Sequence, residues 1–367
     1  MKSEKRHIGW LLGGMLMLLL VVACSEDSNI RTEEPQGNAL HLSAVTRMQR
    51  HTLTPGQRTS TVFTAQDDCS IKMFITTKDV EWSVGQFNYK DNKWENDNLS
   101  VKEHTQYYIY GFMPNDKELV DESDLEKPDK KDFSAGANLI LKSLPVFTEK
   151  DICVIVGVRR VTNTQTTTDA VEGNYSYLSG LASENYVNLL MAHLYCRLIL
   201  QINVDKDYYA LRHIKLKSVT LTSTYGDKIN ATVLHQADEG LGQNSVIYAK
   251  AEGSADNKVW EFLKETDESK VLPSNAENVV ATPIGTINCA PCTFDVNGTY
   301  LSITCTYDVC DANDETKVLR ANCTVTNKLK LSNMYSGVQR TVTLTVAPTY
   351  LYVLSDDDLN NPTIIVN

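Results

Sequence analysis

Short segments in which apolar and polar residues alternate recur along this chain. In residues 39–45, Leu40, Leu42 and Ala44 fall on one side and polar residues on the other, which predicts a half-buried strand. Residues 214–221 alternate in the same way. Further β-prone runs occupy residues 71–75, 107–113, 139–141, 152–156, 198–204, 299–309, 320–326 and 341–346. The sequence has no long amphipathic helix, and the pattern predicts an all-β protein built from β-sandwiches.

Turn-forming residues divide these runs and indicate the domain organisation. A chain of 367 residues favours two domains. Residues 162–185 are rich in Thr, Asn, Ser and Gly, which is typical of a connection between domains. A hairpin is expected around Asp91 and Asn92, and a turn of helix at the start of residues 186–204. We expect an N-terminal β-sandwich domain over 38–165, a linker over 166–185, a C-terminal β-sandwich domain over 186–347 and a strand extension over 348–367.

The first residues of the chain have the composition of an export signal. An apolar run over residues 8–23 follows three basic residues and is shorter than the ~20 residues that span a bilayer comfortably. The run ends in Leu-Val-Val-Ala before Cys24, which looks like a lipobox, where a diacylglycerol is joined to the thiol. We expect residues 1–23 to be a cleaved lipoprotein signal and Cys24 to be lipidated. The alternative is an uncleaved N-terminal helix with an incidental cysteine.

The negative net charge of the chain argues against nucleic acid as a partner. The net charge of −11 becomes −13 when the leader is removed, because the leader carries three basic residues and one acidic residue. Such a surface repels phosphate backbones, so nucleic acid is not an expected partner. Residues 24–37 are polar and acidic and are expected to form a tether between lipid and fold. They also resemble the surface-export signal of some Gram-negative lipoproteins, although a merely soluble spacer has the same composition.

Nine cysteines are present, and eight remain once Cys24 is assigned to lipid. An exported chain can oxidise them, but their pairing is not deducible from spacing. Cys289 and Cys292 form a CxxC motif that is weak support for a redox or metal site, because no second knuckle follows at zinc-finger spacing. Cys305, Cys310 and Cys323 lie in strand-like runs and suit a structural role. A thiol enzyme using Cys289 and Cys292 is the least favoured hypothesis.

No other motif indicates catalysis, so we predict no enzyme, no cofactor and no metal site. His193 precedes Arg197 by four residues and is interpreted as a core or hinge histidine bonded to backbone. The acidic run over residues 356–358 lacks the spaced ligands of a calcium loop and is interpreted as a solvated turn. The aromatic stripe over residues 107–110 is expected to pack in the core. A platform of these tyrosines with Trp82 or Trp94 would instead stack sugars.

The tail of the chain holds two apolar pieces that are too short to be stable alone in water. Either they complete their own domain as a hairpin, or they pair with another molecule. The residues concerned are Tyr350, Leu351, Tyr352, Val353, Leu354, Thr363, Ile364, Ile365 and Val366.

Several of these segments, in order, resemble the fimbrillin family, the pilus subunits of anaerobic Gram-negative bacteria. They are the lipobox, the strand that ends in Arg47, the Tyr-Tyr-Ile-Tyr-Gly-Phe-Met-Pro run at 107–114 and the His-x-x-x-Arg segment at 191–198. The tail over residues 348–354 is also similar to that of fimbrillin-like proteins.

The resemblance implies two transthyretin-like or immunoglobulin-like β-sandwich domains and assembly by strand exchange. A protease would cut after Arg47, with Arg50 as the reserve site, and the strand carrying Leu40, Leu42 and Ala44 would leave. The tail of a neighbouring subunit would then fill the groove. Expected partners are other fimbrial subunits, the outer membrane through the lipid on Cys24, and a host or bacterial surface receptor. The alternative function is a glycan-binding surface lipoprotein that does not polymerise.

Overall fold

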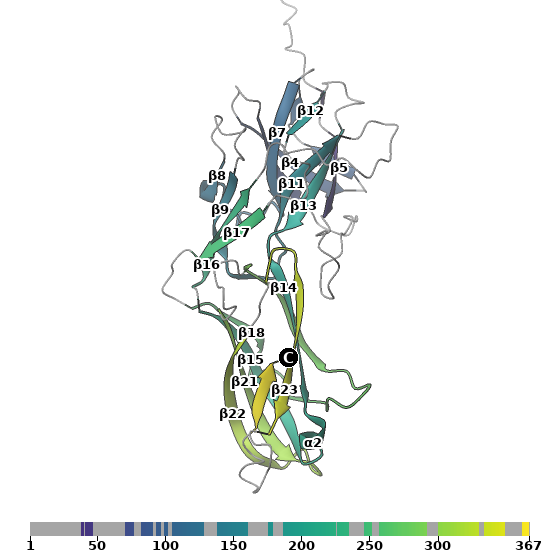
Figure 1. Cartoon of the computed structure of the whole chain (residues 1–367), viewed down its shortest axis with the longest axis vertical. Helices are drawn as coiled ribbons and strands as arrows, with labels where there is room; N and C mark the ends of the chain where they lie inside the picture. Colours follow the sequence, from purple (N-terminus) through teal and green to yellow (C-terminus); the bar gives the residue numbers. More distant parts are fainter. Residues whose placement is uncertain are drawn as a thin grey trace, which may run out of the picture.

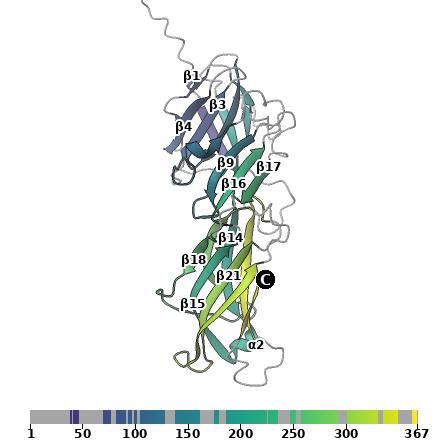
Figure 2. The same cartoon turned by 90° about the vertical axis from the view of Figure 1, so that its left-hand side faces the viewer.

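The computed structural model of the chain is elongated, and β-sheets make up both of its halves (Figures 1 and 2). The structure describes residues 38–39, 41–46, 70–76, 82–90, 93–96, 99–101, 105–127, 138–160, 175–178, 186–224, 226–234, 246–251, 257–291, 300–329, 334–348 and 362–366. Within these residues, no helix is long and apolar enough to cross a membrane.

The largest sheet lies in the half that carries the early strands, drawn at the top of Figure 1. Its strand order is β2-β13-β11-β7-β3-β4-β5, and β12 pairs with β7 as well. The strands are β2 (His41–Thr46), β3 (Ser70–Thr76), β4 (Ser83–Lys90), β5 (Lys93–Asn96), β7 (Thr105–Met113), β11 (Cys153–Arg160), β12 (Tyr175–Leu178) and β13 (Tyr186–His193). All of these pairings are antiparallel except that of β2 with β13.

A four-stranded sheet of order β17-β16-β9-β8 completes this half. Its strands are β8 (Leu125–Glu126), β9 (Asn138–Pro145), β16 (Lys228–Leu234) and β17 (Val246–Ala251). The hairpin β16–β17 therefore comes from the later part of the chain and pairs with β9 from the earlier part. A short pair, β1 (Asn38–Ala39) with β6 (Ser100–Val101), and the 3-10 turn η2 (Glu122–Asp124) lie outside the two sheets.

The other half consists of two five-stranded sheets. One has the order β10-β20-β14-β23-β24, and the other has the order β18-β15-β21-β22 with β19 paired to β15. Their bounds are β10 (Phe147–Thr148), β14 (Cys196–Val204), β15 (Arg212–Ser223), β18 (Val259–Leu263), β19 (Lys270–Val271), β20 (Thr282–Cys289), β21 (Leu301–Asp311), β22 (Val318–Leu329), β23 (Gln339–Ala347) and β24 (Thr363–Val366), with one helix, α2 (Lys206–Tyr209).

Two hydrophobic cores follow from the alternation of side chains along the strands. Strand β7 shows the division: Ile109 faces a small core inside the large sheet, and Tyr110 faces the main core that runs through both halves. Successive residues of a strand point to opposite faces, so both faces of β7 are buried. Gly111 lies opposite Met73 where β7 pairs with β3, and a Cβ there would stand 2.3 Å from the Lys72 carbonyl oxygen. The glycine of the aromatic motif is thus explained by close backbone approach.

The sequence-based prediction of an all-β sandwich fold is confirmed. The expected hairpin is present, because Lys90 pairs with Lys93. The helical turn expected at the start of residues 186–204 was wrong, since Tyr186–His193 forms β13 and is held on both sides by β11 and β2. The predicted linker contains β12, which pairs with β7. The domain bounds stay a prediction, although strands on either side of the linker share one sheet.

Candidate functional site

The first long strand, β2, lies at one edge of the large sheet, where only β13 is its ladder partner. The pairing is parallel, with His41 opposite Tyr186 and Thr46 opposite Met191. Parallel pairing is slightly less stable per residue than antiparallel pairing. Removal of an edge strand breaks one ladder, whereas removal of an inner strand breaks two.

The strand that pairs with β2 contributes to the small core of the large sheet. Leu189 and Met191, the register partners of Ala44 and Thr46, are fully buried in this core. Trp94 on β5, at the opposite edge of the sheet, packs against the same core, and β5 also contacts β2. The sheet therefore curls round its core, so that β2 at one edge meets β5 at the other. Removal of β2 would uncover both an unpaired edge of β13 and apolar side chains.

The structure describes only some of the other residues that were predicted as functional near the start of the chain. Leu42 and Ala44 lie within β2. Leu40, Arg47 and Arg50 lie outside the described residues, as do Cys24 and the leader. Because β2 ends at Thr46, Arg47 is the next residue along the chain.

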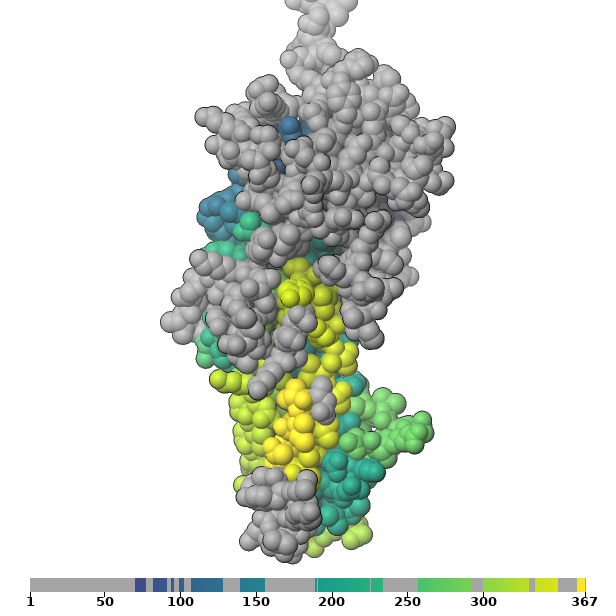
Figure 3. All heavy atoms as spheres, in the orientation of Figure 1, coloured from purple at the N-terminus to yellow at the C-terminus, as the bar shows by residue number. Residues whose placement is uncertain are grey.

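The last strand, β24, pairs antiparallel with β23 of the same chain, from Thr363 opposite Ala347 to Val366 opposite Leu344. It is the edge strand of its sheet, and its atoms lie at the surface in Figure 3. Of its side chains, Ile364 is buried and Ile365 is 47% exposed. The second apolar piece of the tail, residues 350–354, lies outside the described residues.

Two side chains of the neighbouring sheet hold this strand. The Tyr307 hydroxyl donates a hydrogen bond to the Pro362 carbonyl oxygen at 3.2 Å, and the Asn327 amide donates to the Ile364 carbonyl oxygen at 2.9 Å. Burial raises the pKa of Tyr307 well above its ordinary value, so the phenol stays protonated and can donate at any physiological pH. The described part of the tail is thus seated in its own molecule by the buried residues Pro362 and Ile364, by two side-chain hydrogen bonds and by a four-residue ladder.

The aromatic residues do not form the planar platform that a sugar-binding site needs. Tyr107 and Tyr110 are buried, and the Tyr110 ring meets Trp82 edge-on at a centroid distance of 5.5 Å. Trp94 lies against Tyr89 at 5.0 Å and packs on the small core. Their use in packing agrees with the interpretation preferred from the sequence and gives no support to the glycan-binding alternative.

The six cysteines that the structure describes are all buried: Cys153, Cys196, Cys289, Cys305, Cys310 and Cys323. Burial raises the pKa of the Cys289 thiol well above its ordinary value. A catalytic thiol needs the opposite shift, because the thiolate is the nucleophile. Cys292 lies outside the described residues. The environment of Cys289 therefore gives no support to the thiol-enzyme hypothesis.

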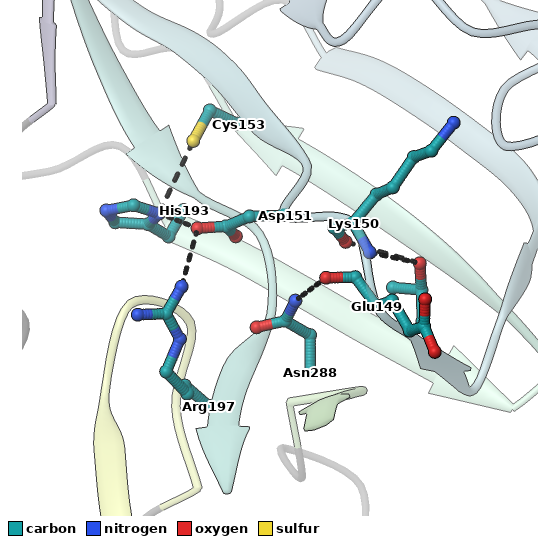
Figure 4. A network of polar contacts seen from close by, with 8 residues as sticks. Glu149, Lys150, Asp151, Cys153, His193, Arg197 and Asn288 are labelled. Atoms are coloured by element: carbon teal, nitrogen blue, oxygen red, sulfur yellow. Dashed lines mark hydrogen bonds and ion pairs between the residues drawn. The ribbon is translucent and has the colours of Figure 1, made fainter. Parts of the chain in front are cut away.

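His193 and Arg197 lie at the junction of the two halves, where β13 ends and β14 begins (Figure 4). The His193 Nδ1 atom is 2.6 Å from the Asp151 Oδ2 atom and 3.4 Å from the Cys153 Sγ atom. Arg197 Nη2 is 3.9 Å from the same Asp151 oxygen. The sequence led us to interpret His193 as a core or hinge histidine bonded to backbone, and it did not reveal the contacts with the Asp151 and Cys153 side chains. Asp151 and Cys153 are two residues apart at the start of a predicted strand, which places them on the same side of the chain. The sequence did not show that the segment carrying His193 pairs with that strand.

Similar folds are found among known structures, while no family model and no curated protein match the chain. The crystal structure of a fimbrial protein from Bacteroides vulgatus is 12% identical in sequence, with a TM-score of 0.50; the match covers 90% of this chain and 98% of that one. This chain has a fimbrillin-like fold. The fimbrial anchor protein Mfa2 from Porphyromonas gingivalis also matches, at 9% identity and a TM-score of 0.29 over 89% of this chain and 97% of that one, which is too distant to carry an argument. At this level of identity the likeness establishes the fimbrillin-like fold alone, so function is argued from the strands described above.

Proposed function

We propose that the protein is a lipid-anchored structural subunit of an adhesive fimbrium at the outer membrane. Cleavage after Arg47, or after Arg50, releases β2 from its edge position. The tail of a second subunit then enters the vacated slot between β13 and β5, and repetition of this step builds the polymer. The observation that carries the proposal is the position of β2, an edge strand over an apolar core with an arginine directly after it.

The acceptor slot suits strand addition. Once β2 has left, the backbone of β13 offers a row of unpaired amide and carbonyl groups, which supply affinity for an incoming strand. Leu189 and Met191, the β13 partners of Ala44 and Thr46, are buried in the small core, and alternate side chains of the incoming strand would pack beside them and set its register.

The tail suits the donor role because it is held only weakly in its own molecule. In its own molecule, Pro362 and Ile364 of the described tail are buried, Val366 packs half-buried against the main core and Ile365 is exposed. If Leu351, Val353, Ile364 and Val366 were all buried in a neighbour's slot, each would contribute about 1.5–3 kcal/mol, or about 10 kcal/mol together before ordering costs. Burial of these four side chains together would favour transfer of the tail from its edge position to the slot.

The direct test is to follow assembly of the chain that starts after Cys24. Treatment with an Arg-specific protease is expected to give a ladder of oligomers, and the double variant Arg47→Ala, Arg50→Ala is expected to stay monomeric. A wild-type chain that is cut at these arginines and still gives no ladder would contradict the proposal.

A mixing experiment separates the two roles. A cut chain lacking residues 349–367 can accept a strand but not donate one, and an uncut full-length chain can donate but not accept. We expect the mixture to give one-to-one complexes and each chain alone to stay monomeric. Complexes that form equally well without the tail in either chain would show that the tail is not the donor.

A further inference from the structure

We propose that Asp151, Cys153 and His193 form a transition-metal site, suited to Zn²⁺, at the junction of the two halves. No metal site was predicted from the sequence, and the inference does not depend on the proposed function. Among the described residues, these three form the one group whose potential ligand atoms all lie within 4.8 Å of one another.

The fold brings the three side chains together by simple strand geometry. Cys153 and His193 are directly opposite each other in the antiparallel pair of β11 and β13. Asp151 precedes Cys153 by two residues and so falls on the same side of the chain. Leu194 donates its backbone N–H to the Ile152 carbonyl oxygen at 2.7 Å, which locks the two chain segments in this register. The donor atoms are therefore positioned by backbone hydrogen bonds and not by long flexible side chains.

The donor set matches the chemistry of zinc. Thiolate sulfur, imidazole nitrogen and carboxylate oxygen are its three usual protein ligands, and a site with three such ligands keeps its fourth position for water. Both the carboxylate and the thiol approach the same Nδ1 atom of His193 (Figure 4). An imidazole that relays a proton between two groups uses both of its nitrogens, so this arrangement is unlike a catalytic triad. Three ligands grouped round one metal ion would have this arrangement.

Small movements of the Asp151 and Arg197 side chains would make room for the ion. Two ligand atoms at about 2 Å from a tetrahedral ion are roughly 3.3 Å apart, whereas Asp151 Oδ2 and His193 Nδ1 are 2.6 Å apart. Rotation of the Asp151 side chain, which is 22% exposed, supplies the difference and opens the path from solvent. Arg197 is 38% exposed and 3.9 Å from Asp151, so its guanidinium can turn to solvent as the cation enters.

Metal binding would release a proton and would stabilise the junction between the two halves. The Cys153 thiol gives up its proton to solvent when it ligates, so affinity rises with pH. The bound ion would tie the end of β13 to the start of β11. Since β14 begins at Cys196, just beyond the end of β13 at His193, the ion would also stabilise the passage of the chain from one half to the other.

The experiment uses the full chain from residue 25 and titrates it with Zn²⁺ and with Co²⁺. We expect one ion per chain, an upward shift in the melting temperature with Zn²⁺, and thiolate-to-cobalt charge-transfer absorption with Co²⁺. Cys153→Ser and His193→Gln should each weaken binding at least about 100-fold, because even loss of a supporting group around a metal costs 10–100-fold.

The chain provides a matched control. His213 and Cys310 are also directly opposite each other, on β15 and β21, and Glu315 lies 3.4 Å from His213. His213→Gln and Cys310→Ser should leave zinc affinity unchanged. The proposal is overturned if the wild-type chain binds no stoichiometric zinc, or if Cys153→Ser binds as tightly as the wild type with no change in the cobalt spectrum.

Discussion

The proposed assembly requires the tail to leave its own sheet. The hydrogen bond from the Tyr307 hydroxyl is one of the contacts that hold it there. Tyr307→Phe removes the hydrogen bond to the Pro362 carbonyl oxygen and keeps the buried ring. Asn327→Ala removes the hydrogen bond to the Ile364 carbonyl oxygen. Neither substitution touches the ladder between β23 and β24, so each weakens the seat of the tail without changing its sequence as a donor.

The expected magnitudes follow from the contacts. Burial of Ile364 contributes about 1.5–3 kcal/mol, and each of the two hydrogen bonds about 1 kcal/mol. These contributions and the hydrogen bonds of the β23–β24 ladder are opposed by the cost of fixing the backbone, about 1–2 kcal/mol for each residue of β24, so the strand is held only weakly. Loss of one hydrogen bond should raise the open population of the tail about 5-fold, and loss of both about 30-fold.

Hydrogen exchange of a peptide covering residues 362–366 measures this population. We expect β24 to exchange well before β23 in the wild type and faster still in the two variants. The control is Tyr300→Phe, which removes a comparable hydrogen bond from a buried hydroxyl to the Ala290 carbonyl oxygen. It should lower the stability of this half without selectively exposing β24. Exchange of β24 only at the rate of β23, unchanged in Tyr307→Phe, would refute the idea of a releasable tail.

Three further predictions concern other parts of the molecule. Gly111→Ala should destabilise the chain by about 1–3 kcal/mol in urea unfolding, because the new methyl meets the Lys72 carbonyl, and a neutral result would contradict the close approach. Cys289 should resist iodoacetamide in the folded chain, since burial raises its pKa well above the ordinary value; labelling as fast as in urea would refute this. Hydrogen bonding from Lys150 holds the pKa of Asp116 below its ordinary value of 3.8, so the small loss of stability in Lys150→Met should be present at neutral pH and vanish as Asp116 is protonated. A loss that persists in acid would show that the pair is not its cause.

Alternation along the chain was sufficient to predict strands whose two faces differ. β15 alternates almost without interruption and was predicted from residues 214–221, within its observed bounds Arg212–Ser223. In the run 186–193 the alternation is interrupted by three consecutive apolar residues, Leu189, Leu190 and Met191, and the strand that they belong to, β13, pairs on both sides. A helical turn was predicted there, which shows that the local pattern does not determine the structure of a strand held on both sides.

The arrangement of strands in sheets could not be predicted from local pattern. The hairpin of β16 and β17 pairs with β9 although β15 of the other half precedes it, and this depends on contacts between residues far apart in sequence. The same limit applies to the junction: His193 was singled out, but its neighbours Asp151 and Cys153 reach it only through the register of β11 with β13. Candidate sites built across strands therefore become visible only once the register is known.

The central claim is that β2 leaves the molecule before assembly, and the N-terminal sequence of the protein in shed fimbriae tests it most directly. The account predicts a chain that begins at Met48, or at His51 if Arg50 is the processed residue. Assembled material that begins at a lipidated Cys24, with β2 still present, would contradict it.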